Sequence, residues 1–192
     1  MSVHQGTLVD AAWPEGTAGA NALRAVALII FGSLLMTVGA KVQVPFYPVP
    51  TTMQTFSLML IIATFGGRLA FGAVGVYLAQ GFVGVPVFAY AAAGPAYFAG
   101  TTGGYLVGFL VAAAVGGWLI EKWGGRGVLR TGAILLISLA IVFACGLTWL
   151  STLIGVPAAL QYGFAHVILG DIVKLALAVA VVAAGWQVVR QR

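Results

Sequence analysis

The sequence predicts an all-α integral membrane protein with six transmembrane helices, and composition is the first observation behind this fold class. Of the 192 residues, 61% are hydrophobic and only 7% are charged, whereas soluble domains have about 25% charged residues. Second, the mean hydropathy of the chain is +1.08. Third, the apolar residues gather into six runs whose connections leave no room for a soluble domain.

The runs begin after an N-terminal tail of residues 1–22, which has no basic residue and so lacks the basic region of a secretory signal. We expect this tail to be a loose or interfacial cytoplasmic segment, and residues 23–192 to form a single membrane domain. The second run is short, because its 15 residues would rise about 22 Å in a helix, against a hydrocarbon core of about 30 Å. The six runs are Leu23–Ala40, Thr51–Phe65, Leu69–Val85, Thr102–Ile120, Leu129–Ile154 and Gly163–Val188.

The basic residues orient the chain in the membrane. If both termini are cytoplasmic, seven of the nine Lys and Arg residues lie on the cytoplasmic side, which the positive-inside rule favours. Lys41 then lies outside and Lys174 within the membrane. Because the basic residues stand at the ends of spans and form no stripe, we expect no nucleic-acid partner. The seven cytoplasmic residues are Arg24, Arg68, Lys122, Arg126, Arg130, Arg190 and Arg192.

Two outer loops are unusual for segments exposed to solvent. The first, residues 41–50, contains three prolines, and the second, residues 81–101, is apolar and aromatic without any charge. Because a solvated loop would be polar, we expect the second loop to fold back over the membrane domain as a lid. The alternative is a re-entrant or interfacial helix.

Three helices are expected to begin on the outer side, and their N-termini would face one cavity. They start near Thr51 and Thr52, near Thr101 and Thr102, and near Gly163, and Thr51 and Thr101 fit the N-cap position. Free N–H groups and positive dipole ends at these positions suit an anionic ligand group.

Small residues at every fourth position predict close helix packing. They are Gly100, Gly104, Gly108, Ala112 and Gly116 in the fourth run and Ala176, Ala180 and Ala184 in the sixth.

The sixth run contains two charged residues away from its ends, Asp171 and Lys174. Three residues of α-helix separate them by about 60° around the axis and about 4.5 Å along it, so their side chains share one face. An ionisable group inside a membrane costs roughly 2.5–3.5 kcal/mol on insertion scales, which makes both residues candidates for a binding site. A structural ion pair is the alternative. His166 lies about 140° from Asp171 on the helix and is a poor partner for it.

Motifs of hydrolytic enzymes are absent from the sequence. There is no phosphate-binding G-x-x-x-x-G-K-[ST], no H-E-x-x-H and no G-x-S-x-G. The chain has two histidines in all and one acidic residue inside the apolar runs. It therefore has very few side chains that could act as a nucleophile and its base. We therefore expect a protein that is not an enzyme.

Four motifs follow one another along the chain. Residues 48–55, PVPTTMQT, have the pattern P-x-P-x-T-x-Q-T, and residues 81–89, GFVGVPVFA, have the pattern G-x-x-G-x-P-V-F-A. Residues 102–109, TGGYLVGF, and the G-D-x-x-K pattern at residues 170–174 complete the set. Together they resemble the motifs of the BioY family, the biotin-specific substrate-binding (S) components of energy-coupling-factor (ECF) transporters. The chain departs from the family in having Gly100-Thr101 where Gly-Pro usually precedes T-G-G-Y.

This resemblance implies an S-component-like bundle in the bacterial plasma membrane that binds biotin with high affinity and needs no cofactor or metal. It also implies partners, namely a transmembrane coupling protein and ATP-binding subunits. A stand-alone carrier, which a short chain could form as a homo-oligomer, is the alternative. Transport in membranes without partner subunits would discriminate between the two.

The candidate site residues suit the chemistry of biotin. Its urea has two N–H donors and one C=O acceptor, which the Asp171 carboxylate and the Lys174 ammonium could bind. The valerate carboxylate could sit on N–H groups at Thr102, Gly103 and Gly104, with Tyr105 as a hydroxyl donor. Thr52 and Gln54 either hydrogen-bond the ligand or cap the helix. Candidates for apolar walls are Phe46, Tyr47, Phe88, Tyr90 and Tyr97.

Overall fold

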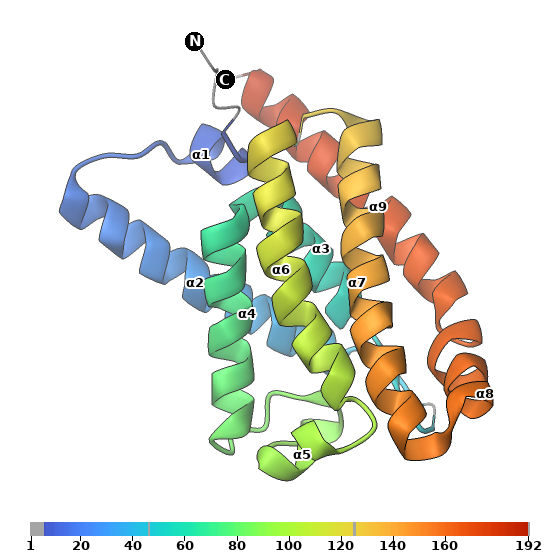
Figure 1. The fold of residues 1–192 in the computed structure, drawn as a ribbon. Coiled ribbons are helices and arrows are strands. Elements are labelled where there is room, and N and C mark those ends of the chain that lie inside the picture. Colours follow the sequence, from blue (N-terminus) through green and yellow to red (C-terminus); the bar gives the residue numbers. More distant parts are fainter. Residues whose placement is uncertain (1–5, 46, 125, 192) are drawn as a thin grey trace.

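A computed structural model describes residues 6–45, 47–124 and 126–191 of the chain, most of which are helical (Figure 1). Two strands of two residues each, β1 (Gln43–Val44) and β2 (Thr51–Thr52), pair as an antiparallel hairpin. The α-helices are α1 (Leu8–Ala12), α2 (Ala18–Lys41), α3 (Gln54–Phe65), α4 (Gly67–Phe82), α5 (Pro95–Ala99), α6 (Gly103–Trp123), α7 (Val128–Ile154), α8 (Val156–Ala158) and α9 (Ile168–Arg190). A 3₁₀ turn, η1 (Ala89–Ala91), precedes α5, and a π-helical segment, η2 (Ala159–Ala165), connects α8 to α9.

Four helical stretches within the described residues are long and apolar enough to cross a membrane. They are Ala18–Lys41, Gly103–Trp123, Val128–Ile154 and the stretch Val156–Arg190. The other two predicted spans form α3 and α4, whose 12 and 16 residues are shorter. Helices therefore form at all six predicted runs, while length alone supports four spans.

The helix start predicted near Thr101 and Thr102 is confirmed, but the N-caps predicted at Thr51 and Thr101 and the start at Gly163 are wrong. Thr51 pairs with Val44 in the hairpin, and Met53 occupies the N-cap of α3. Thr101 donates a hydrogen bond to the carbonyl oxygen of Pro48 at 2.8 Å. The next residue, Thr102, occupies the N-cap of α6. Gly163 lies inside η2, where the helical backbone is continuous, so it provides no free N-terminus.

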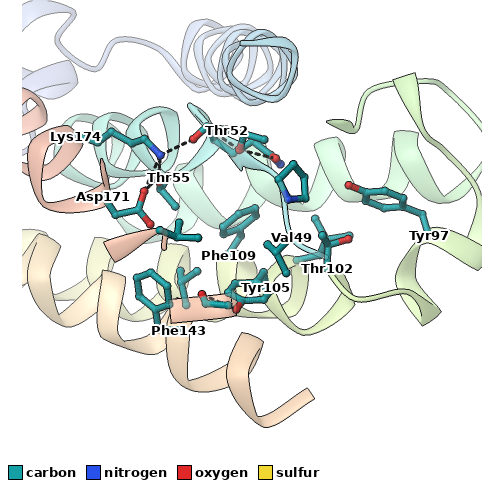
Figure 2. A pocket seen from close by; sticks show the side chains of 16 residues that line it. Val49, Thr52, Thr55, Tyr97, Thr102, Tyr105, Phe109, Phe143, Asp171 and Lys174 are labelled. Atoms are coloured by element: carbon teal, nitrogen blue, oxygen red, sulfur yellow. Dashed lines mark hydrogen bonds and ion pairs between the residues drawn. The ribbon is translucent and has the colours of Figure 1, made fainter. Parts of the chain in front are cut away.

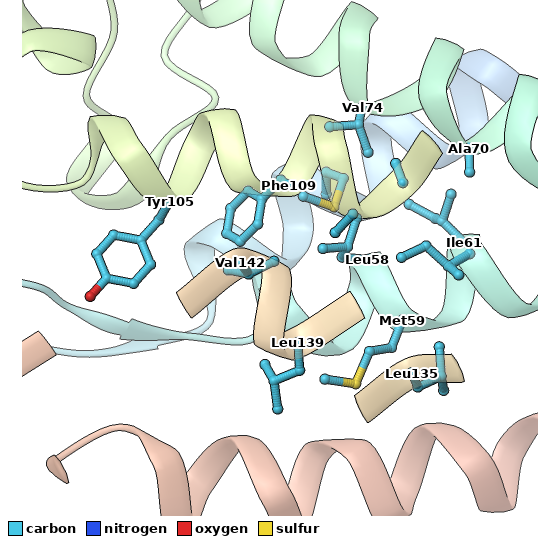
Figure 3. Packing of buried hydrophobic residues seen from close by; sticks show 14 of the residues in the cluster. Leu58, Met59, Ile61, Ala70, Val74, Tyr105, Phe109, Leu135, Leu139 and Val142 are labelled. Atoms are coloured by element: carbon cyan, nitrogen blue, oxygen red, sulfur yellow. The ribbon is translucent and has the colours of Figure 1, made fainter. Parts of the chain in front are cut away.

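The core is built around α3, the shortest of the central helices (Figure 3). Leu58, Met59 and Ile61 of α3 are at most 2% exposed and are surrounded by side chains of α4, α6 and α7. Glycines of α6 allow α7 to approach closely, as the four-residue spacing predicted. A Cβ atom at Gly108 would lie 3.0 Å from the backbone of Val142, so no larger residue fits there without displacement.

The N-terminal segment is docked on the bundle, where a loose tail was expected. Thr7 is only 3% exposed, and its side chain forms a capping box with Asp10 at the start of α1. Asp10 also accepts a hydrogen bond from the guanidinium of the buried Arg24, at 2.7 Å. Leu8 contacts Gly185 of α9, and α2 already begins at Ala18, inside the predicted tail.

The apolar loop predicted at residues 81–101 begins after α4, at residue 83, and folds back over one end of the bundle; we call residues 83–101 the lid (Figure 1). Phe88 is fully buried within it, stacked on Tyr97 at 4.8 Å between ring centroids. Lys41, at the end of α2, donates hydrogen bonds to the carbonyl oxygens of Pro86 and Phe88, at 2.6 and 2.9 Å. Its helical pieces, η1 and α5, have three and five residues, too few for the alternative of a re-entrant helix.

Candidate functional site

A cavity of about 50 Å³ lies inside the bundle beneath the lid and the hairpin (Figure 2). It is bounded by α3, α6, α7 and α9, so segments far apart between residues 49 and 174 meet there. Most of its lining is apolar, with the charged residues at one end. The lining residues are Val49, Pro50, Thr52, Gln54, Thr55, Tyr97, Thr102, Tyr105, Leu106, Phe109, Val142, Phe143, Gly163, Val167, Asp171 and Lys174.

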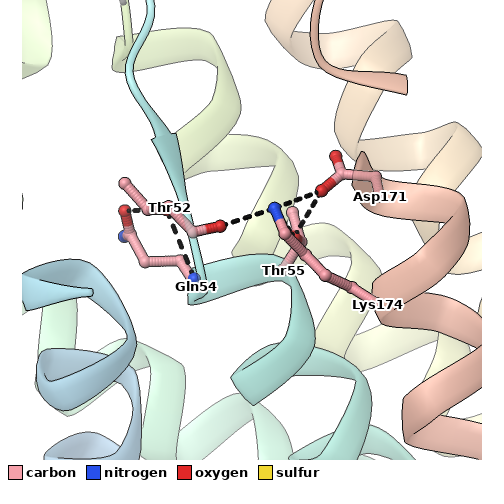
Figure 4. A network of polar contacts seen from close by, with 5 residues as sticks. All are labelled: Thr52, Gln54, Thr55, Asp171 and Lys174. Carbon is pink, nitrogen blue, oxygen red and sulfur yellow. Dashed lines mark hydrogen bonds and ion pairs between the residues drawn. The ribbon is translucent and has the colours of Figure 1, made fainter. Parts of the chain in front are cut away.

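Asp171 and Lys174 form the charged end of this cavity (Figure 4). The Lys174 ammonium lies 2.7 Å from Asp171 Oδ1, as the three-residue spacing predicted, and the two residues are 7% and 1% exposed. Lys174 also donates to the carbonyl oxygen of Thr52 at 2.6 Å and reaches Thr55 Oγ1 at 3.4 Å. Thr52 is the last residue of β2, where the chain turns from the hairpin toward α3, and its carbonyl oxygen is available to a side-chain donor.

Thr55 completes the polar cluster from the first turn of α3. Its hydroxyl donates to Asp171 Oδ1 at 2.8 Å, so that oxygen accepts from both Thr55 and Lys174. Among the described residues, no hydrogen bond reaches Asp171 Oδ2. The carboxylate therefore keeps one oxygen for another donor, while the protein already occupies the donors of the ammonium.

Thr52 and Gln54 line the cavity, but their polar groups are paired with other protein groups. Thr52 Oγ1 accepts from the backbone N–H of Gln54 at 3.2 Å and donates to its side-chain oxygen at 3.0 Å. The Gln54 amide donates to the Tyr77 hydroxyl at 2.7 Å. These bonds hold the start of α3, although Met53, and not Thr52 or Gln54, occupies its N-cap position.

The opposite end of the cavity carries hydroxyl groups. Figure 2 shows Tyr97 and Thr102 away from the Asp171 carboxylate, with Phe109 between the two ends. Burial raises the pKa of Tyr97, so its phenol stays protonated near neutral pH and is able to donate a hydrogen bond. Tyr105 also lines the cavity, but its hydroxyl already donates to the carbonyl oxygen of Gly163 at 3.0 Å.

Five predicted residues do not line the cavity. Phe88 fills the space that Gly81 leaves on α4, where an added Cβ would lie 2.0 Å from the ring. Gly103 and Gly104 pack against Phe98 and Trp149, respectively. Tyr47 and Tyr90 are 91% and 55% exposed, and Phe46, the remaining prediction, lies outside the described residues.

Sequence reasoning missed Thr55 and most of the apolar wall. Thr55 ends the P-x-P-x-T-x-Q-T pattern, which was a signal for it. Phe109 ends the T-G-G-Y-L-x-G-F pattern, which was likewise a signal for it. Phe143 carries no signal of its own, because aromatic residues in membrane helices pack against lipid, core and ligand alike. The other missed lining residues are Val49, Pro50, Leu106, Val142 and Val167.

Sequence comparison places the chain among known proteins. A sequence model described as the BioY family matches residues 11–191. A Pyrococcus horikoshii protein named "Probable biotin transporter BioY" is 35% identical over 156 residues, covering 81% of this chain and 92% of that protein. A Thermotoga maritima protein named "Biotin transporter BioY" is 35% identical over 150 residues, covering 75% and 85%, respectively. A Rickettsia prowazekii protein named "Probable biotin transporter BioY" is 33% identical over 147 residues, covering 77% and 75%.

A solved structure has the same fold. It is described as the "S-component for biotin from an ECF-type ABC transporter", and it superimposes with a TM-score of 0.77. The match covers 92% of this chain and 96% of the other, at 22% sequence identity. The likeness thus extends over nearly the whole length of both chains.

Proposed function

Because this chain belongs to the BioY family, we propose that it is a biotin-capturing S component of a membrane transporter. The relatives are named biotin transporters, so the chain is a transport protein and not an enzyme. The observation that carries the proposal is the buried Asp171–Lys174 pair at the end of an otherwise apolar cavity. That arrangement matches a ligand with one polar ring and an apolar body.

Biotin would lie along the cavity with its urea at the charged end. Asp171 Oδ2 accepts a urea N–H, since only Oδ1 is used by Thr55 and Lys174. Lys174 donates to the urea carbonyl by giving up its longest contact, the one of 3.4 Å to Thr55. The thioether ring and the tail contact apolar side chains, and the carboxylate ends beneath the lid near Tyr97 and Thr102.

The cavity must widen to admit this ligand. Its volume of about 50 Å³ is far below the roughly 300–1,000 Å³ of typical ligand pockets. The lid forms one wall through Tyr97 and is held by the hydrogen bonds of Lys41. We therefore place ligand entry at the lid, where displacing a short loop disturbs none of the long helices.

The energy for uptake would come from ECF partner subunits, a membrane coupling protein and ATPases. The likeness to an S component of an ECF-type ABC transporter supports this choice over a stand-alone carrier. We further propose six spans, with α3 and α4 crossing the membrane despite their length, and both termini in the cytoplasm. This orientation leaves one basic residue, Lys41, on the outer side.

Equilibrium binding of biotin to the purified chain in detergent tests the proposal. We expect sub-micromolar binding that collapses in Asp171→Asn and in Lys174→Ala, because each variant removes a charged hydrogen-bond partner of the urea, which is worth about 1.5–3 kcal/mol. Ser138→Ala is a matched control, since this buried hydroxyl bonds only a backbone carbonyl of its own helix. Absence of biotin binding by the unaltered, folded chain would refute the ligand assignment. Full binding in both variants would refute the site.

A further inference from the structure

A second hollow lies on the outside of the bundle, between the start of α7 and the middle of α9. It is a groove of about 670 Å³ that shares no lining residue with the cavity described above. Its lining consists of glycine and apolar side chains, among them Leu129 and Leu136, which are 88% and 56% exposed. The groove is therefore an open apolar channel along the surface that faces the membrane.

Small residues form its floor and branched residues its walls. On α9, Ala176, Ala180 and Ala183 recur at spacings of four and three residues and so share one face of the helix. On α7, Gly132 faces Val179 of α9, and a Cβ atom there would make an ordinary contact of 3.8 Å with its side chain. A flexible hydrocarbon chain fits a channel of this shape without any polar contact.

Three arginines gather at the end of the groove nearest the C-terminus of α9. Arg130 follows Leu129 directly on α7. Arg190 lies seven residues beyond Ala183 on the same face of α9, about 10.5 Å along the helix axis. The guanidinium of Arg126 lies over the indole of Trp186, 5.0 Å from the ring centre, which brings the connection before α7 against α9.

These arginines have no carboxylate partner among the described residues. The chain has four acidic residues in all. Asp10 and Asp171 pair with Arg24 and Lys174, respectively, and Glu121 accepts the backbone N–H of Gly67 at 2.8 Å. The fourth, Glu15, forms no ion pair among the described residues. The basic end of the groove is thus open to an external anion.

We propose that this groove binds an anionic phospholipid, with one acyl chain in the channel and the phosphate on the arginines. Guanidinium groups bind phosphate through two parallel hydrogen bonds, and Arg126 keeps its N–H donors while it stacks on Trp186. Basic pockets between transmembrane helices on the cytoplasmic side bind anionic head groups, and Trp is common at this depth. A second copy of the chain fits less well, because a two-fold contact would bring two sets of arginines together.

Native mass spectrometry of the full-length chain tests this proposal, with phosphatidylglycerol and phosphatidylcholine of identical acyl chains as probes. We expect phosphatidylglycerol to be retained preferentially, and the preference to fall roughly 5-fold for each arginine removed in Arg130→Gln and Arg190→Gln. Arg68→Gln combined with Lys122→Gln is the matched control, because it removes two charges elsewhere on the same side. Equal retention of the two lipids, or an equal loss in the control, would overturn the proposal.

A groove-filling change tests the acyl-chain part separately. Ala180→Leu should weaken phosphatidylglycerol retention at least several-fold, while the protein keeps its biotin binding and its mass as a single chain. If the unaltered protein is instead a dimer that Ala180→Leu dissociates without affecting lipid retention, the groove holds a second copy and the proposal is wrong. Biotin binding shows in both experiments that the variants are folded.

Discussion

Replacing Thr55 with valine removes one hydroxyl from the charged end of the cavity and keeps the branched shape of the side chain. That hydroxyl donates to Asp171 Oδ1 at 2.8 Å and lies 3.4 Å from the Lys174 ammonium. A hydrogen bond to a charged group contributes about 1.5–3 kcal/mol, and about 1.4 kcal/mol corresponds to a tenfold change in affinity. If the oriented Asp171 carboxylate holds the ligand, Thr55→Val should weaken biotin binding by about 10- to 100-fold.

Isothermal titration of biotin into the purified chain measures this loss, and α3 itself provides the control. Thr64 lies on the same helix and is also half-buried, but its hydroxyl bonds the carbonyl oxygen of Leu60, away from the cavity. Thr64→Val should therefore leave the affinity within about twofold of the unaltered chain. Equal affinities for Thr55→Val and the unaltered chain, or equal losses in the two variants, would refute the reasoning.

Three further changes test other parts of the structure. Gly146→Ala would place a Cβ atom 2.3 Å from the Tyr105 ring, so detergent unfolding should show a loss of about 1–3 kcal/mol; unchanged stability would contradict this packing. Phe88→Ala removes the buried centre of the lid, and hydrogen exchange should accelerate there and not in α7; uniform acceleration would contradict a local role. Burial alone would raise the pKa of Asp10, but its hydrogen bonds, chiefly with Arg24, lower it below the ordinary 3.8. Docking of α1 should therefore be fully stabilised above about pH 3.8 and should weaken as pH falls through the lowered pKa. Hydrogen exchange in α1 measures this pH dependence, which Asp10→Asn should abolish.

The helices could be predicted because lipid imposes a simple pattern on the sequence. Apolar runs mark them, and the start of α7 and the end of α3 fall within one residue of the predicted bounds. The contact between Asp171 and Lys174 could be predicted too, since it depends only on their spacing along one helix. Local geometry of this kind is what a single sequence determines best.

The misplaced residues depended on contacts between distant segments. Phe88 is aromatic like Phe109 and Phe143, which line the cavity. It is buried in the lid instead, because Gly81 leaves space for its ring. Thr51 is a good N-cap residue, but pairing with Val44 keeps it in a strand. The docking of the tail depends on an ion pair between Asp10 and Arg24. These residues lie on different helices, so helical periodicity could not predict their contact.

The Asp171–Lys174 pair also sets the electrical work of transport. Of the described residues that line the cavity, these two alone are charged, so the site itself has no net charge. Biotin brings a single carboxylate, and the loaded site then carries one negative charge. Moving that charge toward a cytoplasm that is negative inside costs about 2.3 kcal/mol for each 100 mV of membrane potential. On the proposed function, the membrane voltage therefore opposes inward movement of the bound anion and does not act on the empty site, which agrees with an energy supply from the proposed partner subunits.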